Sequence, residues 1–284
     1  MPKVLSPEAV AHYHDQGYWT PVPCLEPDEV ARYRSHFEAF EYGFGGEPLG
    51  PYQFKPYLHQ RWAYEIATHR TILDAVEDII GANIRLLYFT IWAKDPGTEA
   101  FVSWHQDSTY FGLSPLDHIT AWVALSDSTS ATGCVEVVPG SHLIDEERAV
   151  RTELGTANML RAGQVIEVGD EEPRADLEVP AGSFSLHHTC LLHNSRPNVG
   201  LDRRIGLGIS YVPTHVMCSS QTRLRAMLVR GTDAFNHFDD EPVPNAQDPT
   251  AGFDAHRDAL ARWNASRAEQ VTLIDAQRKA RMGA

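Results

Sequence analysis

The sequence predicts a mainly β protein with flanking helices. Helical periodicity is confined to about residues 1–82 and returns from about residue 250 to residue 284. Between about residues 83 and 215, short runs rich in β-branched and aromatic residues alternate with Gly, Pro, Ser and Asp turns. Many short strands at modest spacing are typical of a β-sandwich or barrel. We therefore expect one domain over residues 1–284, with a β core, a helical N-terminal part and a helical C-terminal tail.

The N-terminal part should contain three helices. Ser6 has the character of an N-cap, and Pro7 suits the first helical position. Glycines stop two of these helices. The expected elements, in chain order, are a helix from Ser6 to Gly17, a strand over 18–22, a helix over about 26–40, a Gly-, Pro- and aromatic-rich loop over 41–57, and a helix over 61–80 that ends at Gly81.

The strand-like runs share β-branched and aromatic residues bounded by turn residues. They lie at residues 84–93, 119–125, 134–138, 164–168, 184–188 and 205–212. The chain is expected to be irregular from there to about residue 250. The last helix is predicted from apolar and aromatic residues at helical spacing: Phe253, His256, Leu260 and Trp263.

Composition narrows the functional classes. The formal net charge is −14, which disfavours nucleic acid and anionic membrane surfaces as partners, because binding phosphates requires a basic surface. No apolar run reaches the ~18 residues of a membrane span, and the first residues lack the apolar region of a signal peptide. Four widely spaced cysteines suggest neither a zinc site nor a disulfide framework. We expect a cytoplasmic protein, monomeric or homodimeric, that binds a small molecule.

The strongest chemical signal is the segment Trp104-His105-Gln106-Asp107, taken together with His193. Residues i and i+2 of a strand point the same way, so His105 and Asp107 can aim at a common point. His193 can add a second imidazole from a distant strand. Two His and one carboxylate with open positions form the ligand set of non-heme Fe(II) oxygenases. The pair alone is a weak signal, because the chain has 14 His and 38 acidic residues.

Arg204 begins an otherwise apolar strand, eleven residues after His193. Burial of a guanidinium there requires an anionic partner. A small dicarboxylate held by the bidentate fork is one such partner. An internal Asp or Glu in a structural ion pair is the other, and the residues alone do not decide between them.

Four motifs in order resemble the phytanoyl-CoA dioxygenase family. They are His105-Gln106-Asp107, the run from Gly133 to His142 that ends Pro-Gly-Ser-His, His193 followed by Ser195 and Asn198, and Arg204. The resemblance extends from about Ser6 to Val212, including the pattern Gln16-Gly17-Tyr18. Such proteins are Fe(II)- and 2-oxoglutarate-dependent oxygenases on a double-stranded β-helix (jelly-roll or cupin-like) core.

The resemblance implies a role for particular residues. His105, Asp107 and His193 would bind iron. Arg204 would pair with the distal carboxylate of 2-oxoglutarate, and Ser195 would hydrogen-bond the same end. Further cosubstrate contacts are implied at Trp122, Lys55 and Thr90. The turn Pro139-Gly140-Ser141-His142 is interpreted as structural.

The implied reaction is hydroxylation of a C–H bond by O2, with oxidative decarboxylation of 2-oxoglutarate to succinate and CO2. The protein would supply ligand geometry, orientation and a dry pocket. Related halogenases have Ala or Gly at the position of Asp107, which frees a site for chloride, so a carboxylate here favours hydroxylation. Desaturation and epimerisation share the same early chemistry and stay open.

The substrate is expected to contact aromatic residues. Tyr110 and Phe111 follow the HxD pair and match the family pattern; Tyr88 and Trp92 share a strand face with Thr90 and line the barrel mouth or pack in the core. Residues 41–57 and 148–161 are candidate lid loops. These features favour a hydrophobic or ring-bearing small molecule, and the acidic balance does not favour a CoA ester. Surface solvation is expected for the cationic candidates His215, Arg223 and Arg225.

Two other functional classes compete with a 2-oxoglutarate-dependent hydroxylase. A cupin-like, metal-dependent isomerase or hydrolase would use the same ligands without a cosubstrate, and would not need Arg204. A catalytically silent β-barrel binding module would keep the fold without the chemistry, but the complete ligand set counts against it.

Overall fold

The computed structural model describes residues 2–45, 49–144, 150–152, 155, 157–160, 163–245 and 247–282, and only the backbone of residues 110, 249, 274–275 and 277–282. Its helices are α1 (Pro7–Gln16), α2 (Pro27–Tyr42), α3 (Arg61–Ala67), α4 (Arg70–Ile80) and α5 (Pro249–Met282), with 3-10 turns η1 (Gly50–Gln53), η2 (Pro56–Leu58), η3 (Asp107–Tyr110) and η4 (Ser141–Leu143). Its strands are β1 (Tyr18–Pro23), β2 (Ile84–Lys94), β3 (Val102–His105), β4 (Leu113–Ser114), β5 (Ile119–Ala124), β6 (Val135–Val137), β7 (Val150–Thr152), β8 (Gln164–Ile166), β9 (Ala175–Leu177), β10 (Ser183–His188), β11 (His193–Ser195), β12 (Arg204–Pro213), β13 (Met217–Cys218), β14 (Arg225–Arg230) and β15 (Asp239–Asp240).

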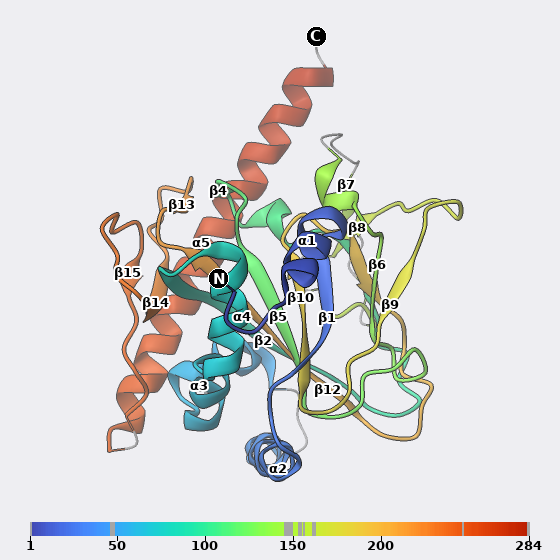
Figure 1. Cartoon of the computed structure of the whole chain (residues 1–284). Coiled ribbons are helices and arrows are strands. Elements are labelled where there is room, and N and C mark those ends of the chain that lie inside the picture. Colours follow the sequence, from blue (N-terminus) through green and yellow to red (C-terminus); the bar gives the residue numbers. More distant parts are fainter. Residues whose placement is uncertain are drawn as a thin grey trace.

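Two sheets form the core. The major sheet has the order β1-β10-β5-β12-β2-β14-β15, and the minor sheet has the order β3-β11-β6-β9. Their pairings are antiparallel except that of β14 with β15. Figure 1 shows α3, α4 and α5 on one side of the molecule and β6 and β9 of the minor sheet on the other. The predicted double-stranded β-helix, or jelly-roll, core with flanking helices is confirmed.

The major sheet has one apolar and one largely polar face, because side chains alternate along each strand. The apolar face packs against the N-terminal helices in the largest core cluster. Its strand residues include Ile119, Ala121, Val123, Phe184, Leu186, Ile205, Leu207 and Ile209. The other face looks toward the minor sheet, and its residues include Thr120, Trp122, Ser185, His187, Arg204, Gly206, Gly208 and Ser210. The fold thus directs small and polar residues of the major sheet into the space between the sheets.

Glycine on β12 makes room for an aromatic ring in that space. A Cβ atom added to Gly206 would lie 1.9 Å from Cζ2 of Trp122, far inside van der Waals contact. The paired residue of Gly208 on β5 is Trp122, and on β2 it is Thr90. The absence of a side chain at Gly206 therefore lets the Trp122 ring lie flat over β12.

The single helix predicted over residues 61–80 is wrong: the structure has α3 and α4 with a break between them. Thr68 ends α3 and bonds back to the Tyr64 carbonyl through its amide (3.0 Å) and its hydroxyl (2.7 Å). His69 then adopts an extended conformation, with ψ 132°. The break lets Ile66 of α3 and Ile72 of α4 both enter the core, where neither side chain is exposed.

The segment predicted to be irregular, residues 213–250, is also different. It contains β13, β14 and β15, and β14 extends the major sheet by pairing with β2. The signal was weak because β14 has the sequence Arg225-Ala-Met-Leu-Val-Arg230, in which only Ala226 and Met227 are buried. β14 lies next to the edge strand β15 and buries few side chains, so its alternation is poorly marked.

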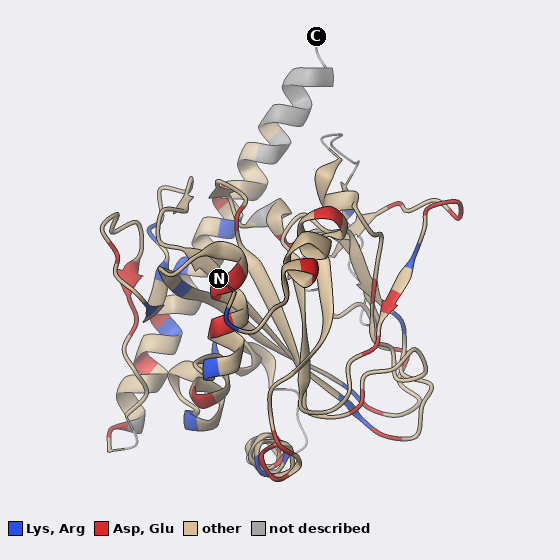
Figure 2. Ribbon diagram, viewed as in Figure 1, with Lys and Arg blue, Asp and Glu red and all other residues tan. Residues whose placement is uncertain are grey.

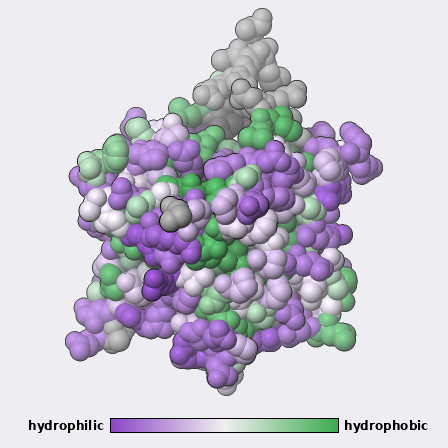
Figure 3. Space-filling view, in the orientation of Figure 1, coloured by the Kyte–Doolittle hydropathy of each residue, from purple (hydrophilic) through white to green (hydrophobic). Residues whose placement is uncertain are grey.

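Charge and hydropathy follow this architecture. Figure 2 shows acidic and basic residues mainly on the helices and loops, with few on the central strands. The face in Figure 3 is largely hydrophilic, with hydrophobic residues exposed near its centre. Within the described ranges, no helix is both long and apolar enough to cross a membrane.

Candidate functional site

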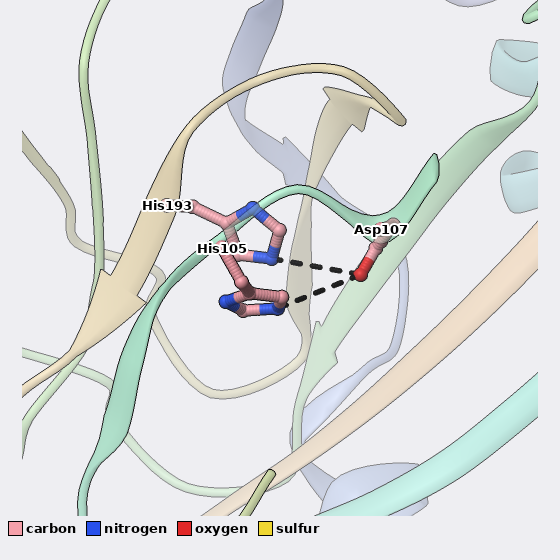
Figure 4. Close-up of side chains that lie close together, drawn as sticks. All are labelled: His105, Asp107 and His193. Carbon is pink, nitrogen blue, oxygen red and sulfur yellow. Dashed lines mark ion pairs between the residues drawn. The ribbon is translucent and has the colours of Figure 1, made fainter. Parts of the chain in front are cut away.

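Three predicted ligands meet between the two sheets. His105 ends β3, Asp107 opens η3 two residues later, and His193 opens β11, which pairs with β3 so that His193 lies opposite His105. Oδ1 of Asp107 lies 3.6 Å from Nε2 of His105 and 3.8 Å from Nε2 of His193. Donor atoms of all three lie within 4.8 Å of one another, and Figure 4 shows both rings pointing at the carboxylate.

Backbone carbonyls prepare both imidazoles for a metal. Nδ1 of His105 lies 2.9 Å from the Ser103 carbonyl oxygen, and Nδ1 of His193 lies 2.9 Å from the Leu191 carbonyl oxygen. A carbonyl only accepts hydrogen bonds, so each Nδ1 must carry the proton. Each Nε2 then has a free lone pair, which is the arrangement found in metal-bound histidines.

The carboxylate of Asp107 is held so that one oxygen is left for a metal. Oδ2 accepts a hydrogen bond from Thr120 Oγ1 (3.2 Å) and lies 3.7 Å from Nε2 of His187. Burial opposes its ionisation, but the surrounding imidazoles of His105, His187 and His193 hold the pKa of Asp107 well below its ordinary value. The group is therefore an anion that presents Oδ1 toward the two ligand imidazoles.

His187 is a site residue that sequence reasoning missed. It lies on the inner face of β10, and its ring centroid is 4.8 Å from that of His193. The signal was present in the alternation of the strand: Ser183, Ser185 and His187 are polar, whereas Phe184 and Leu186 between them are apolar. A polar strand face inside a buried sheet indicates a cavity.

Arg204 lies at the other end of this space, with 1% of its surface exposed. One guanidinium nitrogen donates to the Gly133 carbonyl (2.8 Å) and to Ser195 Oγ (2.9 Å). Within the described ranges, Nε and the second terminal nitrogen have no hydrogen-bond partner. Burial lowers the pKa of Arg204 to about 10, so it stays a cation at neutral pH, and its Cζ lies 5.3 Å from the centroid of the Trp122 ring.

Lys94 is a second buried basic residue beside Arg204, and sequence reasoning missed it. It pairs with Arg204 in the register of β2 and β12. Its ammonium donates to Ser195 Oγ (2.6 Å), to the Ser195 carbonyl (3.0 Å) and to the Arg196 carbonyl. Burial, and then the charge of Arg204, lower the pKa of Lys94 to about 6. Two basic side chains therefore converge on the hydroxyl of Ser195, which itself donates to the Gly133 carbonyl (2.8 Å).

Two adjoining cavities connect these groups. The smaller, about 50 Å³, reaches from the three ligands to Trp122, Ser195 and Arg204. The larger, about 320 Å³, shares Tyr88, Trp92, His105 and Asp107 with it. The remaining walls of the larger cavity come from five parts of the chain: Pro51, Gln53, Phe54, Thr90, Gln106, Phe111, Met159, Leu160, Gln164, Leu260, Trp263, Asn264 and Arg267.

The predicted contacts therefore separate into two groups. Trp122 and Ser195 lie with Arg204 in the smaller cavity, whereas Thr90 and Phe111 lie in the larger one. The side chain of Tyr110 lies outside the described residues. Of the predicted lid loops, residues 41–57 supply Gln53 and Phe54 to the larger cavity. Much of the second loop, residues 148–161, lies outside the described ranges, but its Met159 and Leu160 line the same cavity.

Lys55 lies away from both cavities. Its ammonium is 2.5 Å from Oε1 of Glu241 and 2.8 Å from the Arg225 carbonyl, and the side chains of both partners in the ion pair are almost fully buried. Tyr57 donates to the other oxygen of Glu241 (2.5 Å). The implied cosubstrate contact through Lys55 does not fit this geometry, because the charge is already neutralised by a carboxylate 186 residues further along the chain.

The cationic residues considered for the surface are paired with acids. His215 lies 3.0 Å from Asp117, Arg223 lies 2.6 Å from Asp239, and Arg225 contacts Asp258. The helix α5 instead supplies the cavity wall through Leu260, Trp263, Asn264 and Arg267. Helical spacing had predicted the apolar residues of this helix, but periodicity does not show what an end helix covers.

The donor set fits a particular cofactor. Two neutral imidazoles and one carboxylate oxygen on one side of a pocket leave the remaining metal positions open, as in non-heme Fe(II) oxygenases. Arg204 supplies two free donors of a guanidinium fork within the same cavity, which suits the distal carboxylate of 2-oxoglutarate. The fold and this donor set together define an iron- and 2-oxoglutarate-dependent oxygenase.

Comparison with known proteins agrees with that class. Residues 13–206 match the family described as phytanoyl-CoA dioxygenase (PhyH), and the chain belongs to this family. A probable alpha-ketoglutarate-dependent hypophosphite dioxygenase of Stutzerimonas stutzeri is 27% identical over 223 residues, 72% of this chain and 77% of that protein. Two related structures extend the comparison beyond sequence.

The first is the non-heme monooxygenase ThoJ in its apo form. It superposes with a TM-score of 0.82 at 27% identity, covering 93% of this chain and 99% of that one. The second is the alpha-ketoglutarate-dependent carbocyclase SnoK of nogalamycin biosynthesis, with a TM-score of 0.61 at 26% identity, covering 77% of this chain and 89% of that one. The chain is a dioxygenase of the Fe(II)/2-oxoglutarate type. The names of its relatives describe different reactions: dioxygenase, monooxygenase and carbocyclase.

Proposed function

We propose that the protein hydroxylates an unactivated C–H bond of a small organic molecule, with succinate and CO2 as co-products. Iron is held by Nε2 of His105, Nε2 of His193 and Oδ1 of Asp107. The observation that carries this proposal is that these donors share one cavity with Arg204, a buried cation that lacks an anionic partner. A cupin-like isomerase or hydrolase would have no use for that cation.

The residues of the chain have separate tasks in this reaction. Bound iron supplies the activation of O2 and the oxidation of 2-oxoglutarate. Arg204 fixes the distal carboxylate through its fork, and the ring of Trp122 covers that end of the pocket. Thr120 and His187 lie against Oδ2 of Asp107, so the carboxylate would offer its other oxygen to iron. The larger cavity lies next to His105 and Asp107, where the substrate would meet the metal site.

The carboxylate also favours hydroxylation over halogenation. Asp107 fills the position that an added halide would require, and its pKa is held well below the ordinary value, so it stays a ligand throughout the neutral range. The larger cavity offers space of about 320 Å³ next to His105 and Asp107 for the substrate. That volume lies at the small end of the range for organic ligands.

The test is anaerobic reconstitution with Fe(II), followed by 2-oxoglutarate and an absorption scan. We expect a weak visible charge-transfer band that is lost in Asp107→Ala and in His193→Ala. His36→Ala is the matched control, because His36 is exposed on α2 and far in sequence from the site. Metal uptake without a band in the wild type would contradict the cosubstrate assignment.

The outcome of the reaction needs a second measurement. A screen of candidate substrates by succinate release, followed by mass analysis, should find a product heavier by one oxygen atom. A product of unchanged mass would indicate epimerisation, loss of two hydrogens would indicate desaturation or ring closure, and a chlorinated product would contradict the role given to Asp107.

A further inference from the structure

The C-terminal helix forms one wall of the larger cavity. Leu260, Trp263, Asn264 and Arg267 all line it, at the spacing i, i+3, i+4 and i+7, which places them on one face of α5. These residues lie beyond residue 206, where the match to the family ends. What this wall recognises is therefore not set by the residues that match the family model.

Trp263 is the centre of an aromatic surface on that wall. Its ring centroid lies 4.9 Å from that of Tyr88, 4.9 Å from that of Phe111 and 5.6 Å from that of Phe54. These rings come from α5, β2, the segment after η3 and the segment after η1, so four distant parts of the chain build one apolar face. Such a surface suits the hydrocarbon or ring portion of a ligand.

Arg267 differs from the other described arginines of α5. Arg257 contacts Asp254, and Arg262 lies 2.8 Å from Asp239 and 3.1 Å from Asp258. In the described part of the chain, the guanidinium of Arg267 has neither an ion-pair nor a hydrogen-bond partner, although the residue is half-buried against the cavity. A half-buried guanidinium without an acid is unfavourable unless a ligand supplies one.

A second unpartnered donor lies in the same cavity. Gln164 is 3% exposed, and its Oε1 accepts the backbone N–H of Gln106 (3.1 Å). Its Nε2 is buried and has no hydrogen-bond partner among the residues that the structure describes. Buried amide protons are almost always satisfied, so this one points to an acceptor on a ligand. The cavity thus offers two donors from separate elements and one acid, Asp107, which the metal site uses.

We propose that the substrate is a small amphipathic carboxylate. Its carboxylate pairs with Arg267, and its apolar or ring portion lies on the surface formed by Trp263, Tyr88, Phe111 and Phe54, next to the iron ligands. A single guanidinium matches a monoanion, and the net charge of −14 disfavours a more highly charged ligand. This inference rests on the proposed function, since it assigns the substrate class of the same site.

The test measures binding, not turnover. Naphthalene-2-carboxylate and naphthalene-2-carboxamide are matched probes that differ in charge, and calorimetry with Fe(II) and 2-oxoglutarate present under anaerobic conditions gives both affinities. We expect the wild type to bind the carboxylate about tenfold or more tightly than the amide, because charge-assisted hydrogen bonds exceed neutral ones. Arg267→Gln should remove that preference, and Arg267→Lys should keep part of it.

Arg257→Gln is the matched control, because it removes an arginine from a solvent-facing position of the same helix, where that residue is 72% exposed. It should leave the preference unchanged. Equal affinity for the two probes in the wild type, a preference that survives in Arg267→Gln, or no binding of either probe would overturn the inference.

Failure of this inference is distinguishable from failure of the proposed function. The charge-transfer band of iron with 2-oxoglutarate depends on the ligands and on Arg204, and Arg267 takes no part in it. A normal band without a carboxylate preference removes only the substrate class. Loss of the band in the wild type removes the proposed function, whatever the two probes do.

Discussion

Lys55 and Arg204 are two buried cations in the same small protein, and they are built in opposite ways. Lys55 has a carboxylate 2.5 Å away in Glu241, and the side chain of Glu241 is itself completely buried. Arg204 is equally buried, but its protein partners are a carbonyl and a hydroxyl, and two of its three nitrogens have none. Lys55 is therefore part of a complete ion pair, whereas Arg204 has no anionic partner among the described residues.

This difference distinguishes a buried charge that is compensated within the fold from a buried charge that is compensated by a bound ligand. A buried charge must be compensated, and if the protein does not do so, a ligand must. Lys94 strengthens the contrast, because a second basic group lies beside Arg204 and again meets only neutral acceptors. The end of the cavity at Arg204 is therefore electrostatically incomplete, and the region around Lys55 is complete.

The largest expected effect on stability comes from breaking the ion pair between Lys55 and Glu241. Lys55→Met should lower the free energy of unfolding by about 3–5 kcal/mol, because it leaves the buried carboxylate of Glu241 uncompensated. Denaturant unfolding measures this. Combining it with Glu241→Leu should restore most of the stability, and the double variant should bind 2-oxoglutarate as the wild type does. A Lys55→Met variant as stable as the wild type would show that this ion pair does not stabilise the fold.

The next largest effect is expected on 2-oxoglutarate binding when Arg204 is replaced. Arg204→Ala should weaken 2-oxoglutarate binding by about 100-fold, or ~2–3 kcal/mol, because the distal carboxylate loses its charge-paired partner. Its stability should stay close to that of the wild type, since no internal acid is left unpaired. Titration of the charge-transfer band measures the affinity. Arg203→Ala is the control: Arg203 pairs with Glu41 at 2.8 Å and with Asp95, outside the cavities. A change below about threefold at Arg204 would make it structural.

The ionisation of Lys94 should make stability depend on pH. Its pKa falls from 10.5 in the unfolded chain to about 6 in the folded protein, so between these values the unfolded state binds more protons. Stability should therefore rise with pH over that window, and the contribution is absent in Lys94→Met. We expect the stability difference between variant and wild type to change by on the order of a few kcal/mol from about pH 6 to pH 9. Parallel pH profiles would show that Lys94 does not titrate there.

The smallest expected effect comes from removing the hydroxyl of Ser195, which lies between Lys94 and Arg204. Ser195→Ala removes an acceptor from Lys94 and from Arg204 and should weaken 2-oxoglutarate binding by about 5–10-fold, near 1 kcal/mol. The matched control is Ser185→Ala, since Ser185 is fully buried with a hydroxyl that lacks a partner. That control should leave the affinity unchanged. Equal effects of both substitutions would mean that Ser195 does not position Arg204.

Much of this site was predictable, because it depends on local spacing. The i, i+2 relation of His105 and Asp107 follows from strand geometry, and the structure brings both to His193. The strand runs at 119–125, 184–188 and 205–212 agree with β5, β10 and β12 to within one or two residues. The prediction of one helix over 61–80 was wrong, because α3 and α4 both pack into the same core. The spacing of apolar residues therefore does not show where the first helix ends.

The sequence by itself determined the strand alternation, the order of the ligand motifs and the presence of an arginine at the head of β12. These are properties of neighbouring residues and of regular backbone geometry. The tertiary structure alone decided that Lys55 pairs with Glu241, that Lys94 bonds to Ser195 beside Arg204, that His187 lines the smaller cavity, and that α5 presents Arg267 to the larger one. The reason is that compensation of a buried charge depends on which distant residue packs against it, and chain spacing does not record that.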